Sequence, residues 1–91
     1  MKVFSLQDIA DLLVSIEGAT SKLTGISRVV TDVPGLLTLR ELNNRAALYV
    51  VDCVALLQEG GLRQGEDLNT FVSLAEAFCA EIELLKDPRQ P

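Results

Sequence analysis

The chain offers few side chains for covalent or metal chemistry. It has no histidine among its 91 residues and only two cysteines, Cys53 and Cys79. Histidine is the commonest general base and the commonest metal ligand, so its absence removes the usual starting point for an active site. A zinc ion would need ligands drawn from two cysteines and scattered carboxylates, without a CxxC or HExxH motif. We therefore expect no metal, no cofactor and no enzymatic activity.

Both cysteines fall on apolar positions of helix-like patterns, and free cysteine is among the most frequently buried residue types. The sequence predicts that Cys53 and Cys79 are thiols of the core. In an antiparallel helix pair they would be offset by roughly 10 Å, whereas a disulfide spans at most about 7 Å between Cα atoms. We expect no disulfide between them.

Carboxylates are the most suggestive polar groups of the C-terminal third. The acidic face expected there consists of Glu76, Glu81, Glu83 and Asp87. No Lys or Arg occurs from Gln64 to Leu85, although ordinary soluble faces intersperse both signs of charge. This face has two interpretations: a solvated face that maintains solubility, or an anionic surface that docks a basic partner or imitates DNA phosphates.

The net charge of −5 arises entirely in the second half of the chain. Residues 1–45 carry five basic and five acidic side chains, whereas residues 46–91 carry three basic and eight acidic ones. Phosphate contacts require clustered Lys and Arg. Direct binding to nucleic acid is therefore not expected, and neither is binding to an anionic membrane surface.

Helices must position all of these side chains, because the dominant pattern in the chain is an apolar 3-4-3-4 repeat. The repeat occupies Ile9, Leu12, Ile16, Ala19, Leu23, Ile26, Val30 and Val33, then Leu39, Leu42, Ala46, Tyr49, Cys53 and Leu56, and finally Leu68, Phe71, Ala75, Phe78, Ile82 and Leu85. We predict an all-α fold of a single domain over residues 1–91. It is either a three-helix bundle or a long helical hairpin with a third helix.

Local signals place the predicted helices at about 6–32, 39–59 and 66–86. Ser5 with Asp8, and Thr38 with Glu41, fit capping boxes that open the first and second helices. The Pro34–Gly35 pair is interpreted as the stop of the first helix.

Two glycines leave the first helix open to interpretation. The apolar repeat keeps its phase through Gly18 and Gly25, which favours a continuous helix, although each glycine costs about 1 kcal/mol relative to alanine. The alternative is a helix that breaks near Gly18, followed by an extended segment over 28–33. The glycines are either simple weak points or a notch that lets another backbone approach closely.

The second predicted helix is apolar almost all round. Between Ala46 and Leu57 only Asp52 is polar, and a helix of this kind must be covered on several sides. Residues off its main seam would form a dimer interface: Leu48, Val51, Val54 and Ala55. A chain that is 48% hydrophobic has more apolar surface than so small a domain buries alone, so we expect a homodimer.

These features predict a non-enzymatic interaction protein, a small helical homodimer that acts as an adaptor, regulator or chaperone on a protein partner of unknown identity. The alternative is an acidic inhibitor, of the kind phages and plasmids encode, that occupies the basic site of a nucleic-acid-binding protein. No apolar run approaches the roughly 20 residues of a membrane span, and no export signal is visible. A cytoplasmic location is therefore expected.

Overall fold

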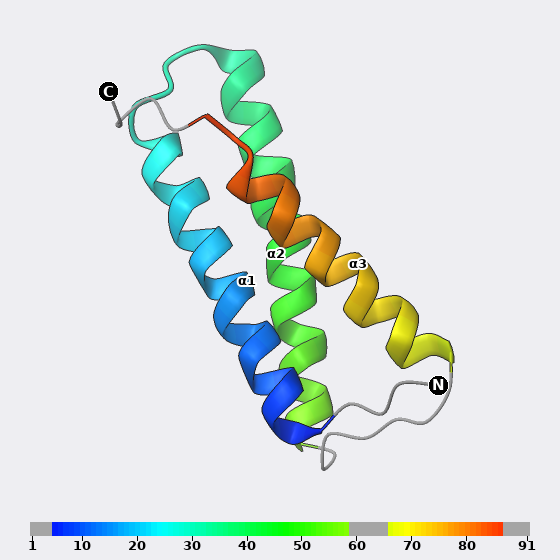
Figure 1. The fold of residues 1–91 in the computed structure, drawn as a ribbon. Helices are drawn as coiled ribbons and strands as arrows, with labels where there is room; N and C mark the ends of the chain where they lie inside the picture. Colours follow the sequence, from blue (N-terminus) through cyan, green and yellow to red (C-terminus); the bar gives the residue numbers. More distant parts are fainter. Residues whose placement is uncertain (1–4, 59–65, 87–91) are drawn as a thin grey trace.

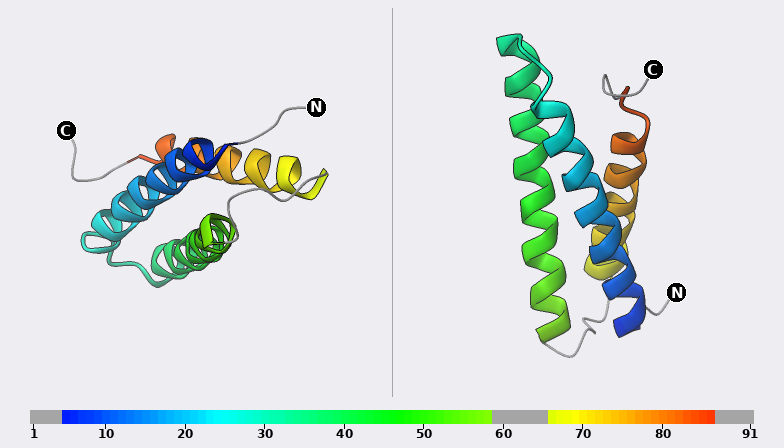
Figure 2. Two further views of the ribbon diagram at one scale, coloured as in Figure 1. Left: turned by 90° about the horizontal axis from the view of Figure 1, so that it is seen from below. Right: turned by 90° about the vertical axis from the view of Figure 1, so that its left-hand side faces the viewer.

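The computed structural model describes residues 5–58 and 66–86, which form three helices and no strand. The helices are α1 (Leu6–Ser27), α2 (Val33–Gln58) and α3 (Glu66–Glu83). Helices α1 and α2 run antiparallel as a hairpin, and α3 lies across one face of it (Figures 1 and 2). Helix α1 packs against both α2 and α3. The prediction of an all-α bundle is confirmed.

The start of α1 agrees with its capping box. The backbone N–H of Asp8 donates to the Ser5 hydroxyl at 3.2 Å, and the N–H of Ser5 donates to the Asp8 carboxylate at 2.9 Å. Each bond satisfies a donor that a helix N-terminus leaves without an intrahelical partner.

Helix α1 is continuous through Gly18 and Gly25. Its many hydroxyl residues do not interrupt it, because their side chains donate to carbonyl oxygens four residues earlier: Thr20 to Ile16 at 3.0 Å, and Ser27 to Leu23 at 2.8 Å. Such bonds satisfy the hydroxyl without leaving the helical geometry. The extended segment considered for residues 28–33 does not form.

The connection between α1 and α2 differs from the expected one. Helix α1 ends at Ser27 rather than near residue 32, and α2 begins at Val33 rather than near residue 39. Asp32 caps α2, because its carboxylate accepts the N–H of Gly35 at 2.7 Å and its carbonyl accepts the N–H of Leu36 at 3.1 Å. Pro34 lies in the first turn, where its missing N–H costs nothing.

The second predicted capping box is therefore wrong. Thr38 lies inside α2, and its hydroxyl donates to the carbonyl of Pro34 at 3.0 Å instead of capping the helix. The Pro34–Gly35 pair, interpreted as the stop of one helix, lies in the first turn of the next.

The apolar repeat forms the core. Buried members are Ile9, Leu12, Ile16, Ala19, Leu23 and Ile26 of α1, Leu39, Leu42, Ala46, Cys53 and Leu56 of α2, and Leu68, Ala75, Phe78 and Ile82 of α3. Val72, which lies off the repeat, is buried as well, whereas the repeat members Tyr49, Phe71 and Leu85 are half-buried. The two last sites of the first repeat fall beyond the end of α1: Val30 is half-buried, and Val33 is 66% exposed. The repeat thus continues in sequence past the helix that it defines.

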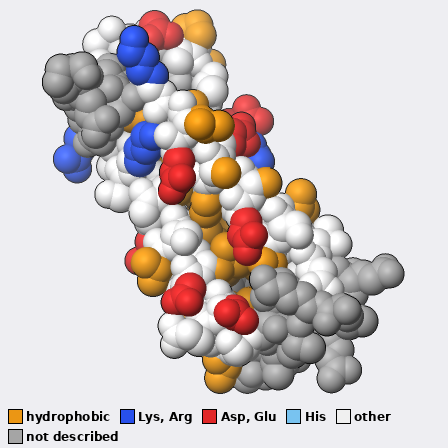
Figure 3. Space-filling view, viewed as in Figure 1, with side chains coloured by type: hydrophobic (Ala, Val, Ile, Leu, Met, Phe, Trp, Pro, Cys, Tyr) orange, Lys and Arg blue, Asp and Glu red, His pale blue; other side chains and the backbone are white. Residues whose placement is uncertain are grey.

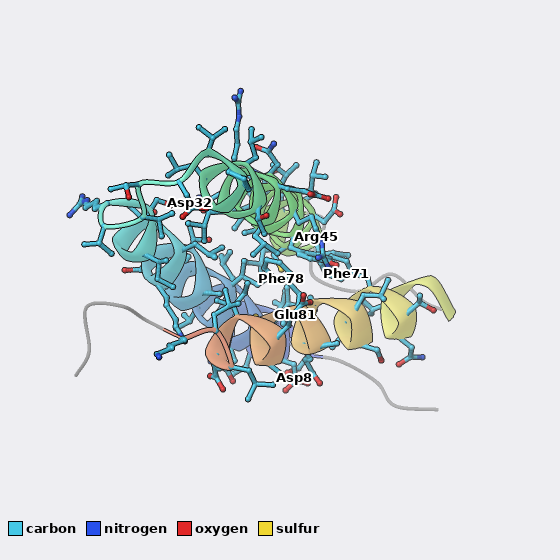
Figure 4. The ribbon with its side chains drawn as sticks, turned by 90° about the horizontal axis from the view of Figure 1, so that it is seen from above. Asp8, Asp32, Arg45, Phe71, Phe78 and Glu81 are labelled. Atoms are coloured by element: carbon cyan, nitrogen blue, oxygen red, sulfur yellow. The ribbon has the colours of Figure 1, made fainter. Side chains whose placement is uncertain are left out.

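Long side chains span the distance between α2 and α3. Tyr49 of α2 contacts Phe71 and Phe78 of α3, with ring centroids 6.0 and 5.3 Å apart and tilted planes. The Arg45 guanidinium lies 4.9 Å from the centroid of Phe78 (Figure 4), within the range of a cation–π interaction. These contacts join α2 to α3 and add to the core packing of α3 against α1.

Candidate protein-binding groove

A groove of about 720 Å³ runs between α1 and α3. Its floor consists of apolar residues that belong to the core, chiefly Leu12, Val72 and Ile82. Because these floor residues are buried by their own neighbours, the groove is shallow rather than a deep apolar pocket.

No helix among the described residues is long and apolar enough to cross a membrane.

One wall of the groove is a single row of α1. Its members repeat at intervals of three and four residues: Asp8, Asp11, Ser15, Gly18 and Lys22. Residues so spaced lie on one flank of a helix. The middle of this row is small, and a Cβ added to Gly18 would meet no atom within 4 Å apart from its chain neighbours and the nearby backbone of its own helix. The centre of the wall therefore leaves room for another molecule to approach closely.

The opposite wall comes from α3 and includes Glu76, Cys79, Ala80 and Glu83. Asp11, Glu76 and Glu83 are exposed. In Figure 3, acidic side chains lie on both sides of a strip of apolar surface. Among the described residues, four carboxylates and one cation line the groove, which gives this lining a negative potential.

Lys22 is the cation of this lining, and it is engaged with the protein. Its ammonium group donates to the backbone carbonyl of Glu83 at 2.9 Å. Glu83 is the last residue of α3, where carbonyl groups lack intrahelical partners and a positive charge suits the helix dipole. The bond closes one end of the groove.

The structure separates the acidic residues that the sequence placed on one face. Glu76 and Glu83 line the groove, but Glu81 lies on the flank that faces α2, 4.0 Å from Arg45 (Figure 4). Five residues of α-helix turn a side chain by about 140°, which carries Glu81 away from Glu76. Both partners of the ion pair are about half exposed, so it contributes little stability. Asp87 lies outside the described residues.

The row predicted to form a dimer interface is exposed on the outer side of α2. Leu48 and Val51 are 66% and 63% exposed, Val54 is 38% exposed, and Ala55 is half-buried. We call these four residues the α2 outer row. None of them belongs to the core of the chain.

The two thiols differ in accessibility. Cys53 is fully buried, whereas Cys79 is half-buried and lines the groove. Burial, and then the neighbouring Asp52 and Cys79, raise the pKa of Cys53 to about 11. Burial, and then Glu83 and Glu76, also raise the pKa of Cys79. Both are therefore protonated near neutral pH and poor nucleophiles. Both are free thiols.

In the part of the chain that the structure describes, no three Cys, Asp or Glu side chains lie close enough to hold a metal ion.

The α1 wall of the groove did not emerge from the sequence analysis, although its signal was present. The row from Asp8 to Lys22 lies one residue before the apolar seam and keeps the same spacing.

No protein-family model matches the chain, and no significant match was found among curated proteins or solved structures.

Proposed function

We propose that this protein is a small, non-enzymatic protein–protein interaction module of the cytoplasm, acting as an adaptor, regulator or chaperone. The observation that carries the proposal is the α2 outer row, whose two most exposed members, Leu48 and Val51, are each more than half exposed. Isolated exposed apolar residues are ordinary. Neighbouring ones on successive turns form a patch, which is typical of an association surface.

The occupant proposed for the α2 outer row is a second copy of the chain. A two-fold interface uses every residue twice, so Leu48 and Val51 would supply four bulky side chains. Burying the exposed part of each gives about 1–2 kcal/mol, from which the cost of association is subtracted. A micromolar dimer needs about 8 kcal/mol after that cost has been met, so Val54, Ala55 and the residues around them must contribute as well. The α1–α3 groove would be left open on another face.

The groove is the surface proposed for the protein partner. It is distinct from the α2 outer row, because the described residues that line it belong to α1 and α3 and none of them to α2. A dimer could therefore present two grooves, one per chain.

Affinity capture from the native host, with identification by mass spectrometry, tests this function. The wild type and a Val14→Lys variant, altered at a 69% exposed position of α1 outside the groove, should capture the same partner. A variant carrying Glu76→Lys and Glu83→Lys should lose it while its helicity and melting stay nearly unchanged, because exposed substitutions alter stability by under about 0.5 kcal/mol. No partner above background for the wild type would contradict the proposal, and equal capture by the double variant would remove the groove from it.

An acidic inhibitor of a nucleic-acid-binding protein is the second candidate. It draws support from the described lining of the groove, in which four carboxylates stand beside one cation. Its support is reduced because Glu81 faces Arg45 rather than joining the others. A competition experiment distinguishes the two candidate functions. If the protein is an acidic inhibitor, duplex DNA should displace it from its partner. If it is an adaptor, the partner should stay bound in the presence of duplex DNA.

A further inference from the structure

We infer that the α1–α3 groove receives one short cationic α-helix of a partner protein, oriented antiparallel to α1. This inference rests on the proposed function and adds the chemistry of the partner. Three properties of the groove carry it: its length, the small residues at its centre and the distribution of its charges.

The length of the groove suits a short helix. Its α1 wall extends from Asp8 to Lys22, which at about 1.5 Å per residue is roughly 21 Å, or four helical turns. A partner helix of about 14–16 residues would follow the whole wall.

The centre of the groove suits a close approach of helices. Ser15 and Gly18 on α1 face the groove opposite Ala80 on α3, and the space beside Gly18 is empty. Small residues let helix axes come near one another. Because the floor is already buried, the partner should place small side chains against it and not a row of large apolar ones.

The charges of the groove are asymmetric along its length. Asp8 and Asp11 lie near the start of α1, while at the other end Lys22, bonded to the Glu83 carbonyl, offsets the negative charge of the Glu83 carboxylate. The partner's Lys or Arg residues should therefore gather at the end near Asp11, where their aliphatic stems can lie along the walls. Asp8 already takes part in the capping box, so the inference assigns it no new bond.

The direction of the partner helix follows from the same two ends of the groove. Helices α1 and α3 run in roughly the same direction (Figure 1), and their C-terminal ends meet at the Lys22–Glu83 bond. The dipole of the partner helix interacts more favourably with the dipoles of α1 and α3 when the partner helix runs in the opposite direction to both. Its C-terminus then lies near Asp11, where cationic residues also suit its own dipole. The expected partner is a helix with small residues on one face and Lys or Arg in its last two turns.

The test uses the full-length protein and a synthetic probe, an alanine-based helical peptide of about 16 residues with capped ends and four lysines in its last two turns. Titration calorimetry at low salt should show saturable binding of one peptide per chain. Affinity should fall about tenfold between roughly 25 and 300 mM NaCl, because screening weakens exposed charge pairs. A peptide of reversed sequence, with the same composition and its lysines in the first two turns, should bind several-fold more weakly.

Matched variants locate the peptide. Glu76→Lys should weaken binding about tenfold through charge, and Gly18→Gln about fivefold through shape at constant charge. Their controls are Glu17→Lys and Ser21→Gln, which are exposed on α1 outside the groove lining and should bind like the wild type. Bound peptide should also slow alkylation of Cys79, which lines the groove, and leave the slow alkylation of Cys53 unchanged.

The inference is overturned if the peptide does not bind, if Glu17→Lys weakens binding as much as Glu76→Lys, or if both sequence directions bind equally. If the host partner is still captured through the groove, these results overturn only the helix inference, and the proposed function is retained. A Glu76→Lys variant whose solution mass also changes would instead identify a second copy of the chain as the occupant and would overturn the inference.

Discussion

The ammonium group of Lys22 on α1 and the carbonyl oxygen of Glu83 on α3 are joined by a hydrogen bond of 2.9 Å across the end of the groove. The two residues are 61 positions apart in sequence. The bond satisfies a carbonyl at the C-terminus of α3 and fixes that end of the helix against α1.

Removing this bond should loosen the end of α3. Lys22→Met keeps the aliphatic stem and loses the donor, so we expect a loss of about 0.5–1.5 kcal/mol in the free energy of unfolding and faster hydrogen exchange in the last turn of α3. Lys22→Arg, which keeps a cationic donor, should retain most of the protection. Equal exchange rates in the wild type and Lys22→Met would show that the bond does not hold the helix end.

The cap of α2 can be assigned by a pair of alanine substitutions. Asp32→Ala should cost about 1 kcal/mol, because the N–H of Gly35 loses its acceptor. Thr38→Ala should cost less than about 0.5 kcal/mol, because the exposed Thr38 hydroxyl only donates back to Pro34. Urea denaturation midpoints measure both, and the reverse order of costs would restore Thr38 as the start of the helix.

Gly18 and Gly35 should respond in opposite directions to replacement by alanine. Gly18→Ala should stabilise the protein by about 0.5–1 kcal/mol, since a Cβ there meets open space inside a helix. Gly35→Ala should destabilise it, because the new Cβ would lie 2.8 Å from the Asp32 carboxylate oxygen and 2.9 Å from a Val30 methyl carbon. Thermal melting distinguishes the two, and a loss of stability in Gly18→Ala would contradict the open geometry of the groove centre.

The cysteines should react slowly and at different rates with an alkylating reagent. Cys79, half-buried in the groove, should be modified before Cys53, which should need unfolding or strongly alkaline pH. The thiolate is the reactive form, and a raised pKa means that the rate at Cys53 keeps rising with pH until about 11. Peptide mapping after timed labelling measures each site. Fast labelling of Cys53 at neutral pH in the native protein would place it outside the core.

The sequence predicted the helices better than their junction. The apolar repeat identified the buried residues because burial follows directly from side-chain period, and Ile16, Cys53 and Phe78 are all inside. The predicted junction between α1 and α2 was wrong because two local signals for a helix start competed. Thr38 with Glu41 and Asp32 with Pro34 both fit a helix start, and the propensities of single residues do not decide which one the folded chain uses.

Prediction of the acidic surface from the sequence was limited for a different reason. The sequence-based prediction grouped Glu76, Glu81 and Glu83 on one face, although helical spacing puts only Glu76 and Glu83 on the same flank of α3 and turns Glu81 away from it. Which helix each flank would meet depends on how α3 lies on the hairpin. That arrangement depends on long-range contacts, which are the core packing of α3 against α1 and the aromatic contacts of Tyr49 with Phe71 and Phe78. Local sequence patterns do not contain these contacts. The groove therefore emerged only from the structure.

Solution mass tests the claim that the α2 outer row is an association surface most directly. Light scattering coupled to size-exclusion chromatography, over a range of concentrations that spans about 1–100 μM, should give the wild type twice the 9.9 kDa of one chain. Val51→Lys should give a folded but monomeric or aggregating species, since the lysine would place a charge in the apolar interface. Val14→Lys, the same substitution at a similarly exposed valine of α1, should remain dimeric. A wild type that stays monomeric at the highest concentration, or a Val51→Lys variant that is still dimeric, would contradict the account.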